Sequence, residues 1–242
     1  LFRSFCAQVQ EPVVCGSGEE QELGLPGERE AVEPDWTPAA GGFTYGGEYF
    51  GVPLPGRHNL ENALLAVRLC EALGCDRAEL ARALPGFRGV GRRLERVGTF
   101  QGAAVYDDYA HNPAKMAASW RAMREVAGRV LGFWRPHGFG PLNLMQQELA
   151  DALAGAMGPA DRLFVLPVFY AGGTARPVLT AEQWVGQLQA RGMAAEHVAD
   201  FDTLEACLRG LAGPRDAVLG MGARDPGLQQ FARRLASVPA TP

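Results

Sequence analysis

The stretch Ala103-Ala104-Val105-Tyr106-Asp107-Asp108-Tyr109-Ala110-His111-Asn112-Pro113 decides the fold. Its first four residues are apolar or aromatic and predict a buried strand. Asn112-Pro113 is typical of a helix start, because asparagine caps exposed N–H groups and proline fits the first helical turn. A strand that passes through a short polar loop into a helix is one β-then-α unit of an α/β fold.

The same unit recurs towards the C-terminus. Strand-like runs lie at 129–134, 162–168, 195–198 and 216–220, and a helical pattern follows each of them. Helix starts are indicated by Thr180-x-x-Gln183, Asp202-x-x-Glu205 and Asp225-Pro226, and a further helix is expected around 144–156. Repeated units of this kind predict a doubly wound α/β domain with a mostly parallel sheet over residues 91–242.

Residues 1–90 have a different pattern. Residues 16–42 are rich in Gly, Glu and Pro and predict a loop region after a short strand at 12–15. A strand pair is expected at 43–45 and 49–52, joined at Gly46-Gly47. A helix capped by Asn59 should end at Gly74, and Asp76-x-x-Glu79 predicts a capping box for a second helix. The edge of this first piece is expected near Pro85-Gly86.

Composition and charge limit the possible functions. The 242 residues are 47% apolar and 21% charged, with no apolar run long enough to span a membrane and no signal-peptide pattern. Residues 1–50 hold nine acidic and two basic side chains, a net of −7, so the remainder carries +3 of the total −4. A mildly basic body suits an anionic small ligand or reflects ordinary surface scatter. No basic stripe with interleaved aromatics supports nucleic-acid binding.

The cysteines point to a reducing compartment. The chain has five, scattered and without Cys-x-x-Cys spacing, which predicts reduced thiols in a cytoplasmic protein and no metal site. The oligomeric state is left open by the sequence.

Three short motifs carry the candidate chemistry. Asp107 and Asp108 follow a strand, where ligands of α/β sheets bind, so a carboxylate there suits ribose hydroxyls or magnesium-bound water; a solvated loop is the alternative. Asn59 and Asn62 lie three apart at a helix start, and their amides match the edge of adenine, although Asn59 also suits a cap. His58 beside them is either a base contact or a turn residue.

The third motif is Gly91-Arg92-Arg93-Leu94-Glu95, expected between the two pieces. A guanidinium suits the charge of ATP phosphates, both in the ground state and during transfer. The alternative is a surface arginine pair bridged to Glu95.

In their order and spacing, these motifs resemble those of the Mur ligases, the ATP-dependent enzymes that form amide bonds in cell-wall synthesis. Within this family, the chain is most similar to the enzymes that add alanine. The resemblance implies a C-terminal Rossmann-like domain over 91–242 and part of the central ATPase domain over 1–90. It implies ATP and Mg²⁺ as cofactors, with a UDP-sugar and an amino acid as small-molecule substrates. It places His58, Asn59 and Asn62 at adenine, Arg93 at the terminal phosphates, and Asp108 at ribose or magnesium-bound water. The resemblance also implies that Arg93, Asp108 and His111 are catalytic residues. It implies that His137 and Tyr170 contact the substrate.

The chain departs from this family pattern at several places. It has one lysine, Lys115, and no Gly-x-x-x-x-Gly-Lys-Ser/Thr stretch, so the polypeptide alone is expected to be inactive. The alanine-adding enzymes usually have Pro-His-Arg-Tyr-Ser-Arg, whose arginines help to hold the amino acid. Here the stretch reads Pro136-His137-Gly138-Phe139-Gly140-Pro141, so both arginines are missing. Folylpolyglutamate synthases and cyanophycin synthetases share the His-Asn-Pro motif. A ligase of either kind, or a non-catalytic nucleotide-binding module, therefore remains an alternative.

Overall fold

The computed structural model describes residues 15–16, 31–32, 36–172 and 178–237. The chain divides into two compact units, Leu1–Arg88 and Gly89–Pro242, and each has its own hydrophobic core. The strand expected at 12–15 lies outside the described residues, apart from Cys15. Cys15 belongs to the short strand β1 (Cys15–Gly16), which pairs with β2 (Ala31–Val32). That the first unit is part of a central ATPase domain stays a prediction.

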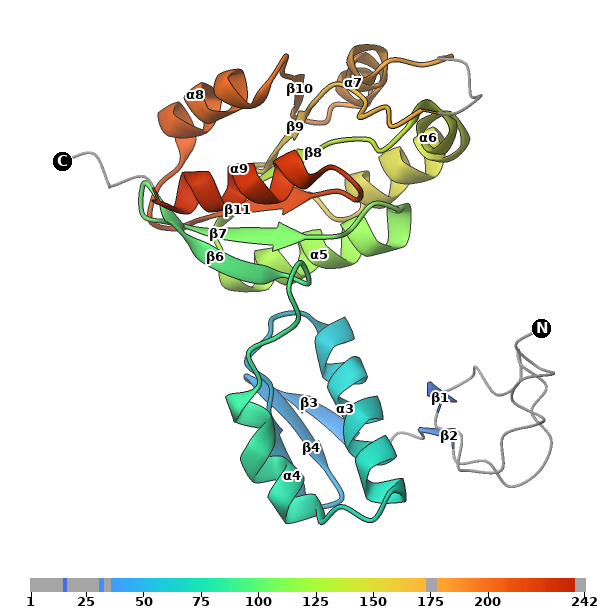
Figure 1. Cartoon of the computed structure of the whole chain (residues 1–242), viewed down its shortest axis with the longest axis vertical. Helices are drawn as coiled ribbons and strands as arrows, with labels where there is room; N and C mark the ends of the chain where they lie inside the picture. The colour runs from blue at the N-terminus through green and yellow to red at the C-terminus, as the bar shows by residue number, and fades with distance from the viewer. Residues whose placement is uncertain (1–14, 17–30, 33–35, 173–177, 238–242) are drawn as a thin grey trace. The chain divides into compact units, whose positions relative to one another are not determined.

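The described part of the first unit contains a three-stranded antiparallel sheet (Figure 1). Its strands are β3 (Trp36–Ala39), β4 (Gly42–Tyr45) and β5 (Glu48–Gly51), in that order. The predicted hairpin is confirmed, because β4 and β5 pair across Gly46 and Gly47, which both have positive φ. Strand β3 was expected to be loop. Its Pro38 argues against a central strand but is tolerated at the sheet edge where β3 lies.

Helix α3 (Arg57–Ala72) begins earlier than the sequence indicates. The residue before it is Gly56, at φ 94°, and it provides no side-chain cap. Asn59 lies within the first turn, and its Nδ2 donates to the carbonyl of Pro55 at 2.7 Å, so the prediction that Asn59 caps the helix is wrong. Asp76 does cap helix α4 (Arg77–Ala83), accepting from the Glu79 amide at 3.0 Å. A 3₁₀ turn, η1 (Leu84–Gly86), ends the unit.

One six-stranded sheet organises the second unit. Its order is β10-β9-β8-β11-β7-β6, and every pair except β6–β7 is parallel. The mostly parallel, doubly wound α/β fold is therefore confirmed. The strands are β6 (Glu95–Phe100), β7 (Ala103–Asp108), β8 (Arg129–Trp134), β9 (Arg162–Val165), β10 (Ala195–His197) and β11 (Asp216–Met221).

Strand β6 is an element that the sequence analysis did not expect, and of the segment Gly91–Glu95 it includes only Glu95. It forms an antiparallel edge of the sheet, and a register shift between Arg96 and Gly98 interrupts its ladder with β7. A bulged strand has a broken alternation of apolar and polar residues, so period-two analysis does not detect it. Strand β9 also ends sooner than the expected run at 162–168.

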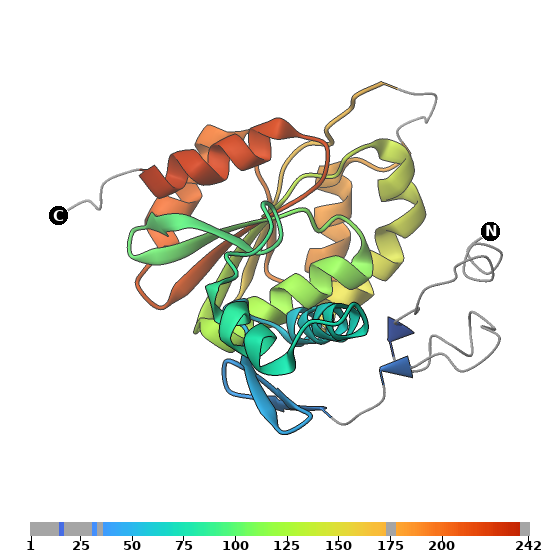
Figure 2. The ribbon, with the colours of Figure 1, turned by 60° about the horizontal axis from the view of Figure 1, so that its bottom comes forward.

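Helices cover both faces of this sheet (Figure 2). Helices α5 (Pro113–Val126), α6 (Phe139–Ala154) and α7 (Ala181–Ala190) pack on one face, and α8 (Phe201–Leu211) and α9 (Pro226–Ser237) on the other. Strand β8 shows how the sequence does this, since Val130 and Trp134 face the first group and Leu131 and Phe133 the second. A strand buried on both faces reads as a continuous apolar run.

The helix starts test the local sequence signals. Asn112 caps α5 through the Lys115 amide, and Thr180 forms the predicted capping box with Gln183, so both predictions are confirmed. The cap of α8 is Asp200, which accepts from the Thr203 amide at 2.7 Å, and not Asp202. Helix α6 begins at 139 rather than near 144. No helix among the described residues is long and apolar enough to span a membrane.

Candidate functional site

The candidate site of the second unit lies where β7, β8 and β11 end. Their last residues are level, because Met221 of β11 is in register with Asp108 of β7 and with Trp134 of β8. Each strand then passes through a four-residue connection into its helix, at 109–112, 135–138 and 222–225. Ligands of open α/β sheets bind at this edge. The third positions of the connections are His111, His137 and Arg224.

Asp107 is buried, 1% exposed, and its partner is Arg92. The Arg92 Nε donates to the Asp107 carboxylate at 3.2 Å, and its terminal nitrogen donates to the Gly222 carbonyl at 2.7 Å. Burial raises the pKa of Asp107, and the charge of Arg92 opposes that shift. Arg92 thus joins the segment before β6 to the ends of β7 and β11, which is a structural role rather than the surface pair considered from the sequence.

Asp108 holds the backbone around it. Its two carboxylate oxygens accept from the amides of Leu94, at 2.7 Å, and Ala110, at 2.6 Å. The side chain is 6% exposed, and burial raises its pKa, while these two hydrogen bonds, a third from the Ser119 side chain and the charge of Arg93 oppose the shift. A carboxylate has about four lone-pair sites, and Leu94, Ala110 and Ser119 occupy three of them, so acceptance from one ribose hydroxyl or magnesium-bound water stays compatible with the geometry.

The structure brings His111 and His137 together. Their rings meet edge to face, with centroids 5.1 Å apart. The Nδ1 of His111 lies 2.8 Å from the Tyr109 carbonyl, and because a carbonyl only accepts, this nitrogen carries the proton. The Nδ1 of His137 is buried and has no hydrogen-bond partner among the described residues. Burial, then His111 and then Arg224, lowers the pKa of His137.

Arg224 is a residue that the sequence analysis missed. It is exposed, has φ 66°, and is the centre of a three-residue turn in which the Asp225 amide donates to the Ala223 carbonyl at 2.8 Å. Gly222, two residues earlier, has φ 145°, and a Cβ there would lie 2.5 Å from Leu228, so glycine is required. The only sequence signal was a polar Ala-Arg-Asp-Pro stretch after a buried strand.

The remaining predicted residues lie at other positions. Arg93 is exposed, and its backbone amide donates to the Val90 carbonyl at 3.1 Å. Tyr170, 49% exposed, follows β9, and its ring packs against Phe139 at the start of α6, with centroids 5.6 Å apart. His58, Asn59 and Asn62 belong to α3 of the first unit, where Asn62 is exposed and the other two are half-buried.

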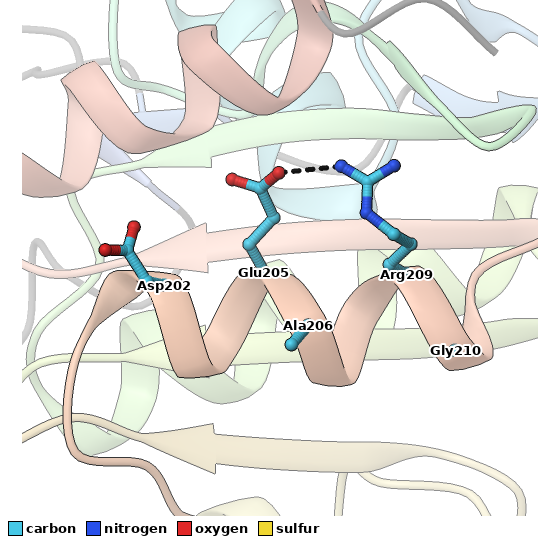
Figure 3. Close-up of a pocket in the computed structure, with 5 residues that line it drawn as sticks. All are labelled: Asp202, Glu205, Ala206, Arg209 and Gly210. Carbon is cyan, nitrogen blue, oxygen red and sulfur yellow. Dashed lines mark hydrogen bonds and ion pairs between the residues drawn. The ribbon is translucent and has the colours of Figure 1, made fainter. Parts of the chain in front are cut away.

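Two surface pockets occur away from these residues. Figure 3 shows one along α8, where Asp202, Glu205 and Arg209 project from successive turns and Glu205 is paired with Arg209 at 2.8 Å. The other lies at the opposite end of β8 and β11, where Arg129 and Asp216 are paired at 2.7 Å. Charged groups that already neutralise each other offer little to a ligand. Among the described residues, no group of three or more His, Cys, Asp or Glu forms a metal cluster.

Comparison with known proteins identifies the second unit. Residues 92–224 match the family model described as Mur ligase, glutamate ligase domain. The UDP-N-acetylmuramate–L-alanine ligase of Streptomyces coelicolor is 39% identical over 178 residues, which is 73% of this chain and 38% of the relative. That of Paracoccus denitrificans is 35% identical over 204 residues, 84% of this chain and 40% of the relative. The chain thus spans about two fifths of these curated relatives.

Solved structures show the same fold. The UDP-N-acetylmuramate-alanine ligase of Thermotoga maritima aligns with a TM-score of 0.72 and 24% identity, covering 97% of this chain and 53% of that one. Mycobacterium tuberculosis folylpolyglutamate synthase aligns with a TM-score of 0.63 and 18% identity, covering 98% and 58%. The resemblance read from the sequence is confirmed, and the family model covers more than half of the chain. The chain belongs to the Mur ligase family, and residues 92–224 form its glutamate ligase domain.

Proposed function

We propose that this chain is the C-terminal portion of an ATP-dependent ligase that joins an amino acid to the carboxylate of a UDP-N-acetylmuramate-like sugar. The names of the curated relatives support this substrate class. One observation carries the proposal. The four-residue connections after β7, β8 and β11 bring imidazole and guanidinium groups together at the sheet edge where α/β proteins bind ligands.

The proposed reaction has two steps. A carboxylate oxygen of the sugar attacks the terminal phosphorus of ATP, which gives an acyl phosphate and ADP. The amine nitrogen of the amino acid then attacks the acyl carbon, and the tetrahedral intermediate expels phosphate as the amine loses a proton. No protein nucleophile is needed, because positioning and charge stabilisation lower the barrier.

The proposed roles of the residues follow from their exposure and contacts. Arg93 is exposed, which fits a guanidinium that binds the terminal phosphates. Asp108 holds the Leu94 amide, so it positions the Arg92–Leu94 turn in addition to any contact with ribose or magnesium-bound water. Mg²⁺, when bound, would neutralise phosphate charge during transfer. His58, Asn59 and Asn62 are proposed at adenine, with Asn62 the most open of the three.

A chimera tests this function. The chain lacks a phosphate-loop lysine motif, so the purified 242-residue polypeptide is expected to release no phosphate from ATP. Residues 36–242 should instead restore turnover when they replace the matching C-terminal part of the Streptomyces coelicolor relative. Phosphate release would be measured with ATP, UDP-N-acetylmuramate and a panel of amino acids. No release from a folded chimera that binds ATP would reject the proposal.

Matched variants of this chimera separate the role of Arg93 from general surface charge. Arg93→Ala should reduce the rate at limiting ATP by about tenfold or more, because a charged hydrogen bond to phosphate is lost. Arg96→Ala, an exposed neighbour on β6, should leave that rate unchanged. Asn62→Ala should likewise weaken ATP use. Equal rates for Arg93→Ala, Asn62→Ala and the parent chimera would contradict the assigned roles.

A folylpolyglutamate-type ligase is the second candidate. The likeness to the Mycobacterium tuberculosis synthase shows a shared fold, and the His111-Asn112-Pro113 stretch suits either enzyme. Folate with glutamate in the same panel distinguishes the two activities. Nucleotide binding without turnover on any acceptor would instead favour a non-catalytic module.

A further inference from the structure

The row formed by His111, His137 and Arg224 has a defined register. The strand ends Asp108, Trp134 and Met221 are level, and each member of the row lies three residues beyond one of them. The two imidazoles are in contact, and Arg224 is near enough to His137 to affect its ionisation. Three titratable side chains from separate connections therefore gather at one edge of the sheet.

Arg224 differs from Arg92 and Arg135, which lie at the same edge and are paired. Arg92 is paired with Asp107, and Arg135 donates to Asp225 at 2.9 Å and to the Pro167 carbonyl at 3.0 Å. The guanidinium of Arg224 has no hydrogen bond or ion pair within the described ranges, and its side chain is exposed.

The backbone of Arg224 is in an unfavourable conformation. A central residue at positive φ, spanned by a hydrogen bond from residue i+2 to residue i, is the pattern of the rare and strained γ-turn. Non-glycine residues held in such conformations cluster at functional sites. An arginine at this position carries a steric cost that glycine would avoid.

The charge of the row is supplied by Arg224. The pKa of His137 is lowered, so its ring is neutral at physiological pH. The neighbouring carboxylates are already engaged, since Asp225 accepts from Arg135 and from the Gly227 amide, and Asp108 accepts from two backbone amides. A lone guanidinium beside a neutral imidazole with an unpartnered buried nitrogen is suited to a small anion with two acceptor oxygens.

We propose that Arg224 binds the carboxylate of the incoming amino acid, with His111 and His137 lining the same place. This inference rests on the proposed function, because the amine donor of that reaction is the anion in question. It makes Arg224 a specificity-determining residue: the guanidinium would select donors with a free carboxylate over amines that lack one.

Arg224→Gly is the sharpest test. Glycine adopts φ 66° without steric cost, so the guanidinium is removed while the turn is retained, and Tm should stay within a few degrees of wild type. The matched control is Arg215→Gly, which removes an exposed arginine next to the opposite end of β11. Binding to the 242-residue chain would be followed by NMR of labelled histidines. The probes are glycine, L-alanine and L-serine, each compared with its amide.

Carboxylate recognition predicts three results. At least one amino acid should perturb the His111 and His137 signals. Its amide should bind with an affinity at least about tenfold lower. This difference in affinity between acid and amide should disappear in Arg224→Gly and persist in Arg215→Gly. In the chimera, Arg224→Gly should raise KM for the amino acid about tenfold and leave KM for ATP unchanged.

Several outcomes overturn the inference. Equal binding of acid and amide, no binding of any probe, or an unchanged KM for the amino acid in an active Arg224→Gly chimera would each do so. The two proposals fail separately. If the chimera is inactive but the chain binds amino acids through their carboxylate, the ligase function is rejected and the carboxylate-binding role of Arg224 is retained. If the chimera is active and Arg224→Gly does not change its KM for the amino acid, the ligase function is retained and the role of Arg224 is rejected.

Discussion

Asp108 shows how one carboxylate can organise a site. It satisfies the amides of Leu94 and Ala110, so the segment that carries Arg92 and Arg93 is held to the end of β7. Buried N–H groups that lose their acceptor cost about 1–3 kcal/mol each. The acidic pair that reads as a candidate ligand in the sequence is thus also a structural support.

Asp108→Ala should lower the free energy of unfolding by roughly 2–6 kcal/mol, because two buried amides are left without an acceptor. Urea denaturation measures this. Asp202→Ala is the control, since Asp202 is 89% exposed and its ion pair with Arg234 lies at the surface, so a change within about 0.5 kcal/mol is expected. If the two variants were equally stable, the support assigned to Asp108 would be wrong.

His137 gives a pH dependence with a defined sign. Because the pKa of His137 in the folded protein lies below the ordinary histidine value of about 6.5, the unfolded chain binds more protons in the window just beneath that value. The free energy of unfolding should therefore fall as pH falls from 7 through 6. His137→Gln should flatten this part of the profile. A profile that stays flat in the wild type argues against the burial of His137.

Local signals of secondary structure were read correctly where a cap is formed by residues close in sequence. Asn112 and Thr180 have partners three residues away, so the sequence contains the whole interaction. Asn59 and Asp202 were misassigned for a different reason. Asn59 finds a nearer carbonyl at Pro55, and Asp200 is better placed than Asp202 by the turn that precedes α8. Competing polar residues within a few positions cannot be ranked from sequence.

The cap of α5 provides a test for this level of structure. Asn112→Ala should destabilise the protein by about 1 kcal/mol, because the Lys115 amide loses its acceptor, and Asn112→Asp should keep most of the stability. Thermal or urea unfolding distinguishes them. An alanine variant as stable as the aspartate variant would show that the cap contributes little.

The candidate site was only partly predictable for reasons of the same kind. His111 and His137 were identified through their motifs, but their contact depends on the register of β7, β11 and β8. Arg224 was missed because its positive φ and its proximity to His137 arise from tertiary structure. The sequence did not predict strand β6 because a bulge interrupts its alternating pattern, and it did not predict β3 because the strand contains a proline.

At the scale of the whole molecule, the two units have separate cores. The second unit buries Trp120, Trp134 and Trp184 within its own helices and strands. Residues 89–242 should therefore fold alone and retain the near-UV circular dichroism of these three tryptophans. A further truncation to 103–242 removes β6 and the buried Leu94, and should lose stability by several kcal/mol. A 89–242 fragment without a cooperative transition would contradict this division.

The equal length of the three connections limits how this edge of the sheet can vary. An added residue in any of them would shift one side chain out of the row, and it would also turn the start of the following helix by about 100°. Deletions would act in the same way. Diversification of this surface is therefore expected through exchange of side chains, while insertions are expected in other loops.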